Sequence, residues 1–136
     1  DLYPAMAVKS QIIQVREPQM GEGVAYGFNY RVAKPVQIAT VPIGYADGVR
    51  RNLSGRMRVL YKGRPCRQVG NICMDMMMIE IPFDAGVEKA KIGDEVVILG
   101  QQGDYEITAD MMADELDTIN YELICMFGAR LPRIYV

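Results

Sequence analysis

The chain has 136 residues; half of them are apolar, 24% are charged, and the formal net charge is -2. This balance is typical of one globular domain with a packed core and argues against a disordered or nucleic-acid-binding chain. Histidine is absent, which excludes nucleophiles activated by histidine and histidine-ligated metal sites. Proton transfer near neutral pH must therefore use tyrosine, lysine, cysteine or a carboxylate with a shifted pKa.

The cysteine pattern and the N-terminus give expectations about the compartment. Cys66, Cys73 and Cys125 are odd in number and show no C-x-x-C spacing, so we expect buried, reduced thiols rather than a zinc site or a disulfide framework. No apolar run approaches the ~20 residues of a membrane span, and the first residues, DLYPAMAVKS, lack the pattern of a signal peptide. We therefore expect a cytoplasmic protein.

The first third of the chain predicts strands. A strand is expected over 7–16, joined as a hairpin through turn residues 18–23 to a second strand over 24–30, and a third strand is expected over 36–43. In the second, larger residues occupy alternate positions, namely Val24, Tyr26, Phe28 and Tyr30.

A glycine-punctuated loop, GYADGVRRNLSGR, follows at 44–56 and carries Arg50 and Arg51, the densest positive spot in the chain. The loop matches neither the phosphate-binding loop nor the dinucleotide fingerprint. Two neighbouring arginines are most often solvated, although they would also suit a carboxylate or phosphate ligand.

Strands continue beyond this loop, and helices are expected only near the C-terminus. A hairpin with Lys62-Gly63 at its tip, a methionine-rich strand over 71–81 and a short strand over 96–99 are predicted. Thr108 is expected to cap a helix that ends near Asp117. Thr118 is expected to cap a second helix, which runs to Phe127 and stops at Gly128. The sum is an all-β, mainly barrel-like fold with one or two short helices, in a single domain over 1–136.

Several side chains are candidates for chemistry, each with a plain structural alternative. For Tyr26, Tyr45 and Tyr121, residue pattern alone favours ordinary strand or helix aromatics whose hydroxyls reach a partner at the edge of the core. Asp75, an acid in an apolar stretch, must be paired with an arginine or a backbone donor, or else must face a site. The neighbouring methionines suit core filling better than a binding surface.

Six strings occur in order along the chain: GVAYG, PIGYADG, VGNICMDM, IGDEVVILG, TINYELIC and RLPRIYV. Together they resemble the C-terminal domain of bacterial alanine racemases. The resemblance implies an enzyme that uses pyridoxal 5'-phosphate, with an N-terminal (β/α)8 barrel and a mostly-β second domain, assembled as a head-to-tail homodimer. This chain is similar to the second domain alone.

The resemblance also implies roles for individual residues. Tyr26 would be one of two catalytic bases, presented to the partner subunit, while a lysine of the barrel would hold the cofactor and act as the other base. The backbone N–H of Met74 would meet the substrate carboxylate, and the hydroxyl of Tyr121 would reach the cofactor phosphate. None of the chain's own lysines lies in a string that matches the cofactor lysine, so that group is expected outside this chain.

The same resemblance places three further residues, Tyr45, Arg51 and Ile119, at the substrate entrance. One departure is Asn71, which stands where the family commonly has arginine, so the charge of the entrance is altered. Tyr121 stands where serine-racemising relatives can carry asparagine, which favours alanine as the substrate.

The implied function is the interconversion of L- and D-alanine, an isomerase activity that supplies D-alanine for cell-wall peptidoglycan. Two alternatives stay open. The first is a domain of a serine or broad-specificity racemase, fused to a membrane or ligase module upstream. The second is a non-catalytic β-barrel binding module that kept the family's core.

Overall fold

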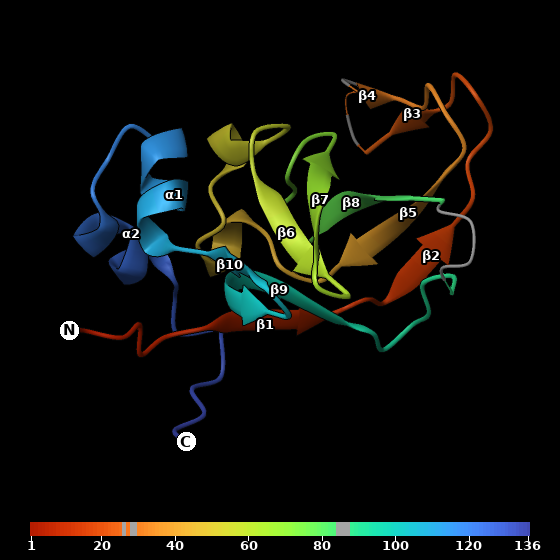
Figure 1. The fold of residues 1–136 in the computed structure, drawn as a ribbon. Helices are drawn as coiled ribbons and strands as arrows, with labels where there is room; N and C mark the ends of the chain where they lie inside the picture. The colour runs from red at the N-terminus through yellow and green to blue at the C-terminus, as the bar shows by residue number, and fades with distance from the viewer. Residues whose placement is uncertain (26, 28–29, 84–87) are drawn as a thin grey trace.

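The computed structural model describes residues 1–25, 27, 30–83 and 88–136 (Figure 1). The described part contains two α-helices, α1 (Ala109–Glu115) and α2 (Asn120–Met126), and two short 3-10 helices, η1 (Tyr45–Asp47) and η2 (Arg51–Leu53). Its strands are β1 (Val8–Gln11), β2 (Gln14–Arg16), β3 (Gly23–Val24), β4 (Tyr30–Arg31), β5 (Val36–Val41), β6 (Arg58–Tyr61), β7 (Arg64–Val69), β8 (Met77–Pro82), β9 (Glu95–Gln102) and β10 (Tyr105–Ile107). The expected all-β fold with two short C-terminal helices is confirmed.

The main sheet is antiparallel and runs in the order β1-β9-β6-β7-β8-β5-β2, with β10 added to β9. Its first and last strands are successive pieces of one stretch of chain. Between them, the Ile12 N–H donates to the Asp94 carbonyl at 2.9 Å, and the Ile13 N–H donates to the Thr40 carbonyl at 3.0 Å. The path of paired strands therefore starts and ends in the same segment.

The apolar core is enclosed by this sheet and by the two helices. All six residues of β5 are buried: Ala39 and Val41 join the inward residues of β8 and β9 in the main core, while Val36 and Ile38 belong to a smaller cluster with Val24, Val32 and Val69. The helices contribute Met112, Ala113 and Leu123 to the main core, and Phe127, directly after α2, adds a fourth buried side chain. Figure 1 shows α1 and α2 together on one side of the molecule and the small β3–β4 sheet on the other.

The hairpin predicted at residues 58–69 is confirmed. β6 pairs with β7, and the Tyr61–Arg64 pair leaves Lys62 and Gly63 as a two-residue turn. Both turn residues have positive φ, 48° and 72°, as a type I′ turn requires.

The N-terminal hairpin predicted between 7–16 and 24–30 is wrong. The first of these segments divides into β1, which pairs with β9, and β2, which pairs with β5. Of the residues of the second segment that the structure describes, Val24 and Tyr30 lie in strands and pair with each other. Between them Ala25 and Gly27 have φ values of 63° and 87°, which break the extended backbone that the alternating pattern predicts.

The helix ends agree with the sequence at one helix and differ at the other. Thr108 caps α1 as predicted, since its Oγ1 accepts from the Met111 N–H at 3.1 Å. The cap residue of α2 is Ile119 rather than Thr118, and no side chain caps it. Neither helix has the length and apolarity that a bilayer-crossing span needs in the part of the chain that the structure describes.

The three cysteines form no disulfide, but only Cys66 is buried. Cys73 is half-buried and Cys125 is exposed, so the expectation of three buried thiols is wrong. For Cys125 the reason is the orientation of α2, which turns Leu123 toward the core and leaves Ile124 and Cys125 outside. Cys73 lies in the loop before β8, where residues leave the sheet.

Candidate functional site

Two loops that are remote in sequence lie side by side and carry Tyr45 and Met74. The Tyr45 N–H donates to the Cys73 carbonyl, and the Ala46 N–H donates to the Met74 carbonyl, both at 3.0 Å. Gly44 makes this approach possible, because a Cβ there would lie 2.6 Å from the Met74 carbonyl oxygen and nearer still to that of Cys73. The side chains of Tyr45 and Met74 are both exposed.

The loop that carries Met74 is not the strand that the sequence predicts. β8 begins only at Met77, so residues 71–76 leave the sheet and their N–H groups lose ladder partners. Within the described residues, the Met74 N–H donates to no acceptor. Met77 fills the core as predicted, whereas Met74 and Met76 are exposed. A backbone donor is therefore available beside Tyr45.

Arg130 joins these two loops from the C-terminal segment. Its Nε lies 3.1 Å from Oδ1 of Asp47, and its Nη2 donates to Oδ1 of Asp75 at 2.7 Å. Asp47 is only 3% exposed, and its second oxygen accepts the Gly44 N–H at 3.0 Å. The hydrogen bond to Asp75, together with the charge of Asp47, raises the pKa of Arg130. The sequence suggested a buried Asp75, which is wrong because its side chain is 55% exposed. Of the alternatives considered for it, pairing with an arginine is the one observed, although sequence reasoning singled out neither Arg130 nor Asp47.

The loops of Tyr45 and Met74 together form an exposed rim, and the loop that carries Arg51 is attached to it. Ser54 Oγ donates to the Arg51 carbonyl at 2.5 Å and accepts the Ile72 N–H at 2.8 Å, which ties η2 to the Met74 loop. Arg50 pairs with Glu122 of α2 at 3.4 Å. Arg51 has no acidic partner among the described residues. Of the two neighbouring arginines, Arg51 is thus the one available to an anionic ligand.

Tyr121 lies on α2 and faces a different hollow. Its side chain is 76% exposed and lines a surface cavity of about 550 Å³, together with Asp110 and the N-terminal residues 2–6. Tyr45 and Met74 do not line this cavity. Ile119, one residue before α2, is also exposed. The structure therefore brings Tyr45, Met74 and the Arg51 loop together and leaves Tyr121 beside a separate surface.

The chain that leads to Tyr26 reaches the same rim, although Tyr26 itself lies outside the described residues. Val24 and Ala25 pack against Gly70, where a Cβ would lie 2.7 Å from the Val24 carbonyl oxygen and 2.6 Å from the Ala25 Cβ. Gly70 has a φ of +69°, a second reason for glycine at this position. Ala25 is thereby set against the start of the Met74 loop.

The β3–β4 sheet is anchored to the main sheet by one buried acid. The Tyr30 hydroxyl donates to Glu80, and Lys34 Nζ lies 3.6 Å from the same carboxylate. Burial raises the pKa of Glu80. This contact ties the small sheet to the centre of β8.

The lysines of the chain are all on the surface, and each is paired with a glutamate. The pairs are Lys9–Glu95, Lys34–Glu80, Lys62–Glu88, Lys89–Glu17 and Lys91–Glu88. None of these lysines contacts the loops of Tyr45 and Met74. The described residues also contain no cluster of three cysteines or carboxylates that could hold a metal ion.

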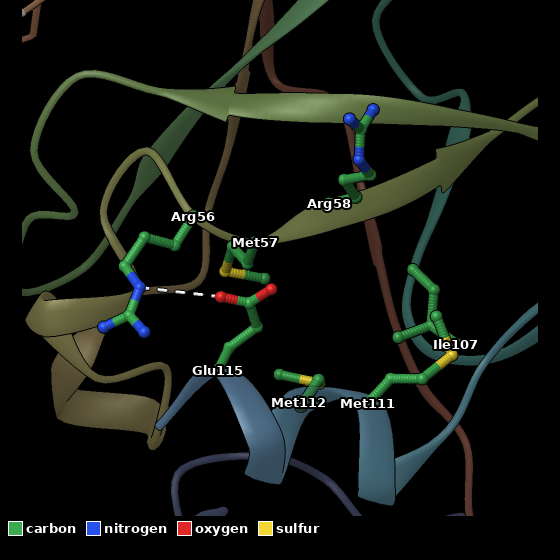
Figure 2. A pocket seen from close by; sticks show the side chains of 7 residues that line it. All are labelled: Arg56, Met57, Arg58, Ile107, Met111, Met112 and Glu115. Atoms are coloured by element: carbon green, nitrogen blue, oxygen red, sulfur yellow. Dashed lines mark ion pairs between the residues drawn. The ribbon is translucent and has the colours of Figure 1, made fainter. Parts of the chain in front are cut away.

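A second, smaller cavity of about 190 Å³ lies between β6 and α1 (Figure 2). Figure 2 shows Arg56 reaching toward Glu115, with 3.5 Å between Nε and Oε2, beside the side chains of Met57 and Met112. Both methionines are buried, so the floor of the cavity is the edge of the core. No predicted site residue lines it, and it is not the candidate site.

Comparison with known proteins decides the family. The sequence model of the family described as alanine racemase, C-terminal domain, matches residues 5–135. This chain belongs to that family. The alanine racemase of Synechocystis sp. is 44% identical over 136 residues, which are 100% of this chain and 36% of the relative. That of Symbiobacterium thermophilum is 46% identical over 134 residues, 98% of this chain and 35% of the relative.

Solved structures of alanine racemases share the family's fold. The Bacillus anthracis alanine racemase with bound L-Ala-P superposes with a TM-score of 0.92 at 37% identity, covering 99% of this chain and 33% of that one. The enzyme from E. faecalis gives a TM-score of 0.90 at 41% identity, covering 98% of this chain and 34% of that one. This chain spans about a third of the length of these relatives.

Proposed function

We propose that this chain is the C-terminal part of a cytoplasmic alanine racemase, an isomerase that interconverts L- and D-alanine and so supplies D-alanine for peptidoglycan. The observation that carries the proposal is the family match over residues 5–135. The paired Tyr45 and Met74 loops support it, because they offer a free backbone donor at an exposed rim, as a site for a small amino acid requires.

The cofactor of this proposed enzyme is pyridoxal 5'-phosphate, which supplies the electron sink for charge that develops at the substrate α-carbon. This chain supplies only a small part of the cofactor-binding site. The exposed Tyr121 can donate its hydroxyl to a phosphate, whereas all five lysines are paired with glutamates away from the rim. The lysine that holds the cofactor therefore belongs to the N-terminal barrel, outside this chain.

Tyr26 is the catalytic base that this chain contributes. Racemisation needs one base on each face of the α-carbon, because one removes a proton and the other returns a proton to the opposite side. An unperturbed tyrosine has a pKa of about 10, so the complete site must stabilise the phenolate with donors or positive charge. The packing of Ala25 against Gly70 supports a position for this segment beside the Met74 loop.

The other rim residues bind and select the substrate. The Met74 N–H donates to the substrate carboxylate, and Tyr45, Arg51 and Ile119 line the entrance. Because Tyr45, Met74 and Tyr121 are exposed in this chain, their site is completed by other polypeptide: the barrel and a second subunit of a head-to-tail homodimer. Alanine is favoured over serine because the relatives are named alanine racemases and because Tyr121 is present.

The test compares the full-length protein with the isolated chain. Full-length protein is expected to interconvert L- and D-alanine, while the isolated chain with added pyridoxal phosphate shows no turnover. Sustained racemisation by the isolated chain would overturn the proposed division of the bases. A full-length protein that racemises serine but not alanine would overturn the proposed substrate.

A further inference from the structure

We propose that Arg130 is a positioning residue for the amino-acid substrate, because it holds the loop of Tyr45 and the loop of Met74 at a fixed spacing. The inference rests on the proposed function. Arg130 comes from a third segment of chain and contacts both loops next to their site residues. Asp47 is two residues from Tyr45, and Asp75 directly follows Met74.

The contact is suited to arginine in particular. Its Nε lies 3.1 Å from the Asp47 carboxylate and its Nη2 lies 2.7 Å from the Asp75 carboxylate, so two donors of one planar group bridge two carboxylates. A lysine has a single ammonium at the end of a flexible stem and cannot reproduce that fork. Without Arg130, the nearly buried Asp47 would lose its cation and would face Asp75 with no charge between them.

Other contacts keep the fold when the bridge is removed. The hydrogen bonds from Tyr45 and Ala46 to the Met74 loop do not involve Arg130. The C-terminal segment is held separately by Arg133, whose guanidinium donates to the carbonyls of Phe127, Gly128 and Leu131 at 2.9–3.2 Å. Loss of Arg130 therefore loosens the spacing of the two loops more than it unfolds the domain.

The kinetic consequence follows from what Met74 does. A backbone donor that holds the substrate carboxylate acts equally on the bound substrate and on the transition state, so weakening it raises KM and leaves kcat nearly unchanged. The catalytic base lies on a different segment, which Arg130 does not contact among the described residues. Arg130 should therefore affect binding rather than proton transfer.

The experiment measures kcat and KM for both alanine enantiomers in the full-length protein and in Arg130→Ala. We expect KM to rise about tenfold or more, with kcat within about threefold of the parent. Arg130→Lys should recover part of the loss, because it restores one of the two ion pairs. The matched control is Arg56→Ala: Arg56 and Arg130 are similarly exposed, 52% and 53%, and Arg56 pairs with Glu115 away from both loops.

Three outcomes would overturn the inference: a KM in Arg130→Ala within twofold of the parent, a loss confined to kcat, or an equal rise of KM in Arg56→Ala. If Arg130→Ala does not fold, Asp75→Asn replaces it, since it removes only the exposed half of the bridge and should raise KM in the same direction. An unchanged KM in a folded Asp75→Asn protein would then reject the inference. A parent protein without alanine racemisation would overturn the proposed function as well, and this result is obtained before any variant is measured.

Discussion

The β6–β7 hairpin and the rim formed by the Tyr45 and Met74 loops are held together in opposite ways. The hairpin is local: its two strands are joined by a two-residue turn whose positive φ values fit the twist of the strands. The rim joins residues 44–47 to residues 73–75 and to Arg130, through a few backbone bonds and two ion pairs. Local backbone geometry therefore fixes the hairpin, whereas long-range polar contacts fix the rim.

The difference extends to energetics. The sheet buries apolar side chains such as Ile79 and Val97, which stabilise the fold through burial. In the rim, by contrast, the side chains of Tyr45 and Met74 are exposed to solvent and add little burial to the stability of this chain. Substitutions in the two regions should therefore have different effects. Those in the sheet should lower the stability of the fold, and those in the rim should chiefly change activity.

The largest effect is expected in the sheet. Ile79, at the centre of β8, is fully buried, so Ile79→Ala should lower the free energy of unfolding by about 2–5 kcal/mol. Urea unfolding of the chain measures it. The control Ile92→Ala, at a position that is 71% exposed, should stay within about 0.5 kcal/mol of the parent. Equal losses at the two positions would contradict the assignment of the core.

A second, smaller effect on stability is expected where the rim loops meet. Gly44→Ala would place a Cβ against the carbonyls of Cys73 and Met74, which should cost about 1–3 kcal/mol and also lower racemisation by the full-length protein. Gly128→Ala is the matched control, because its Cβ would make only an ordinary 3.8 Å contact with the Ala46 carbonyl. If Gly44→Ala retained full activity and stability, the close approach of the two loops would not matter.

The helix caps allow a third test, with an expected effect of about 1 kcal/mol. Thr108→Ala removes the hydroxyl that accepts the Met111 N–H and should destabilise the chain by about that amount. Thr118→Ala should change stability by no more than a few tenths of a kcal/mol, since Thr118 does not cap α2. Thermal or urea unfolding of the two variants measures the difference. A larger loss of stability in Thr118→Ala than in Thr108→Ala would contradict the observed caps.

The smallest expected effect is a pH dependence at the base of the β3–β4 sheet. Burial raises the pKa of Glu80 above its ordinary value of 4.5, so the folded chain holds this proton more tightly than the unfolded chain does. The resulting stabilisation is complete below pH 4.5 and is lost as pH rises through the folded pKa. Glu80→Gln should remove this component of the pH profile.

Carbon-13 NMR of the Glu80 carboxylate measures the midpoint of its pH titration directly, and we expect that midpoint above pH 4.5. A Glu80 midpoint at or below 4.5 would show that the donors Tyr30 and Lys34 outweigh burial.

The sequence predicts those features that depend on neighbouring residues. The Lys62-Gly63 turn and the Thr108 cap were both predictable, because the residues that form them lie within a few positions of one another. The alternation from Val24 to Tyr30 misled, because the positive φ of Ala25 is not encoded in a pattern of large and small side chains.

Long-range features of the rim had no local signal. No sequence pattern near Asp47 or Asp75 indicates that Arg130, which is remote in sequence, pairs with both of them. An arginine partner for Asp75 was one of the alternatives that the sequence offered, but the burial that would have required a partner is absent, since Asp75 is exposed. The roles of Tyr26, Met74 and Tyr121 came from the family resemblance and stay predictions until they are measured.

We propose that this chain supplies one of the two catalytic bases, Tyr26, and the variant Tyr26→Phe in the full-length protein tests this role. We predict that interconversion of the alanine enantiomers falls by about 10²–10⁴-fold. Exchange of the α-hydrogen with solvent deuterium should persist for one enantiomer alone, because the base on the other face is intact. Undiminished racemisation in both directions would contradict the claim.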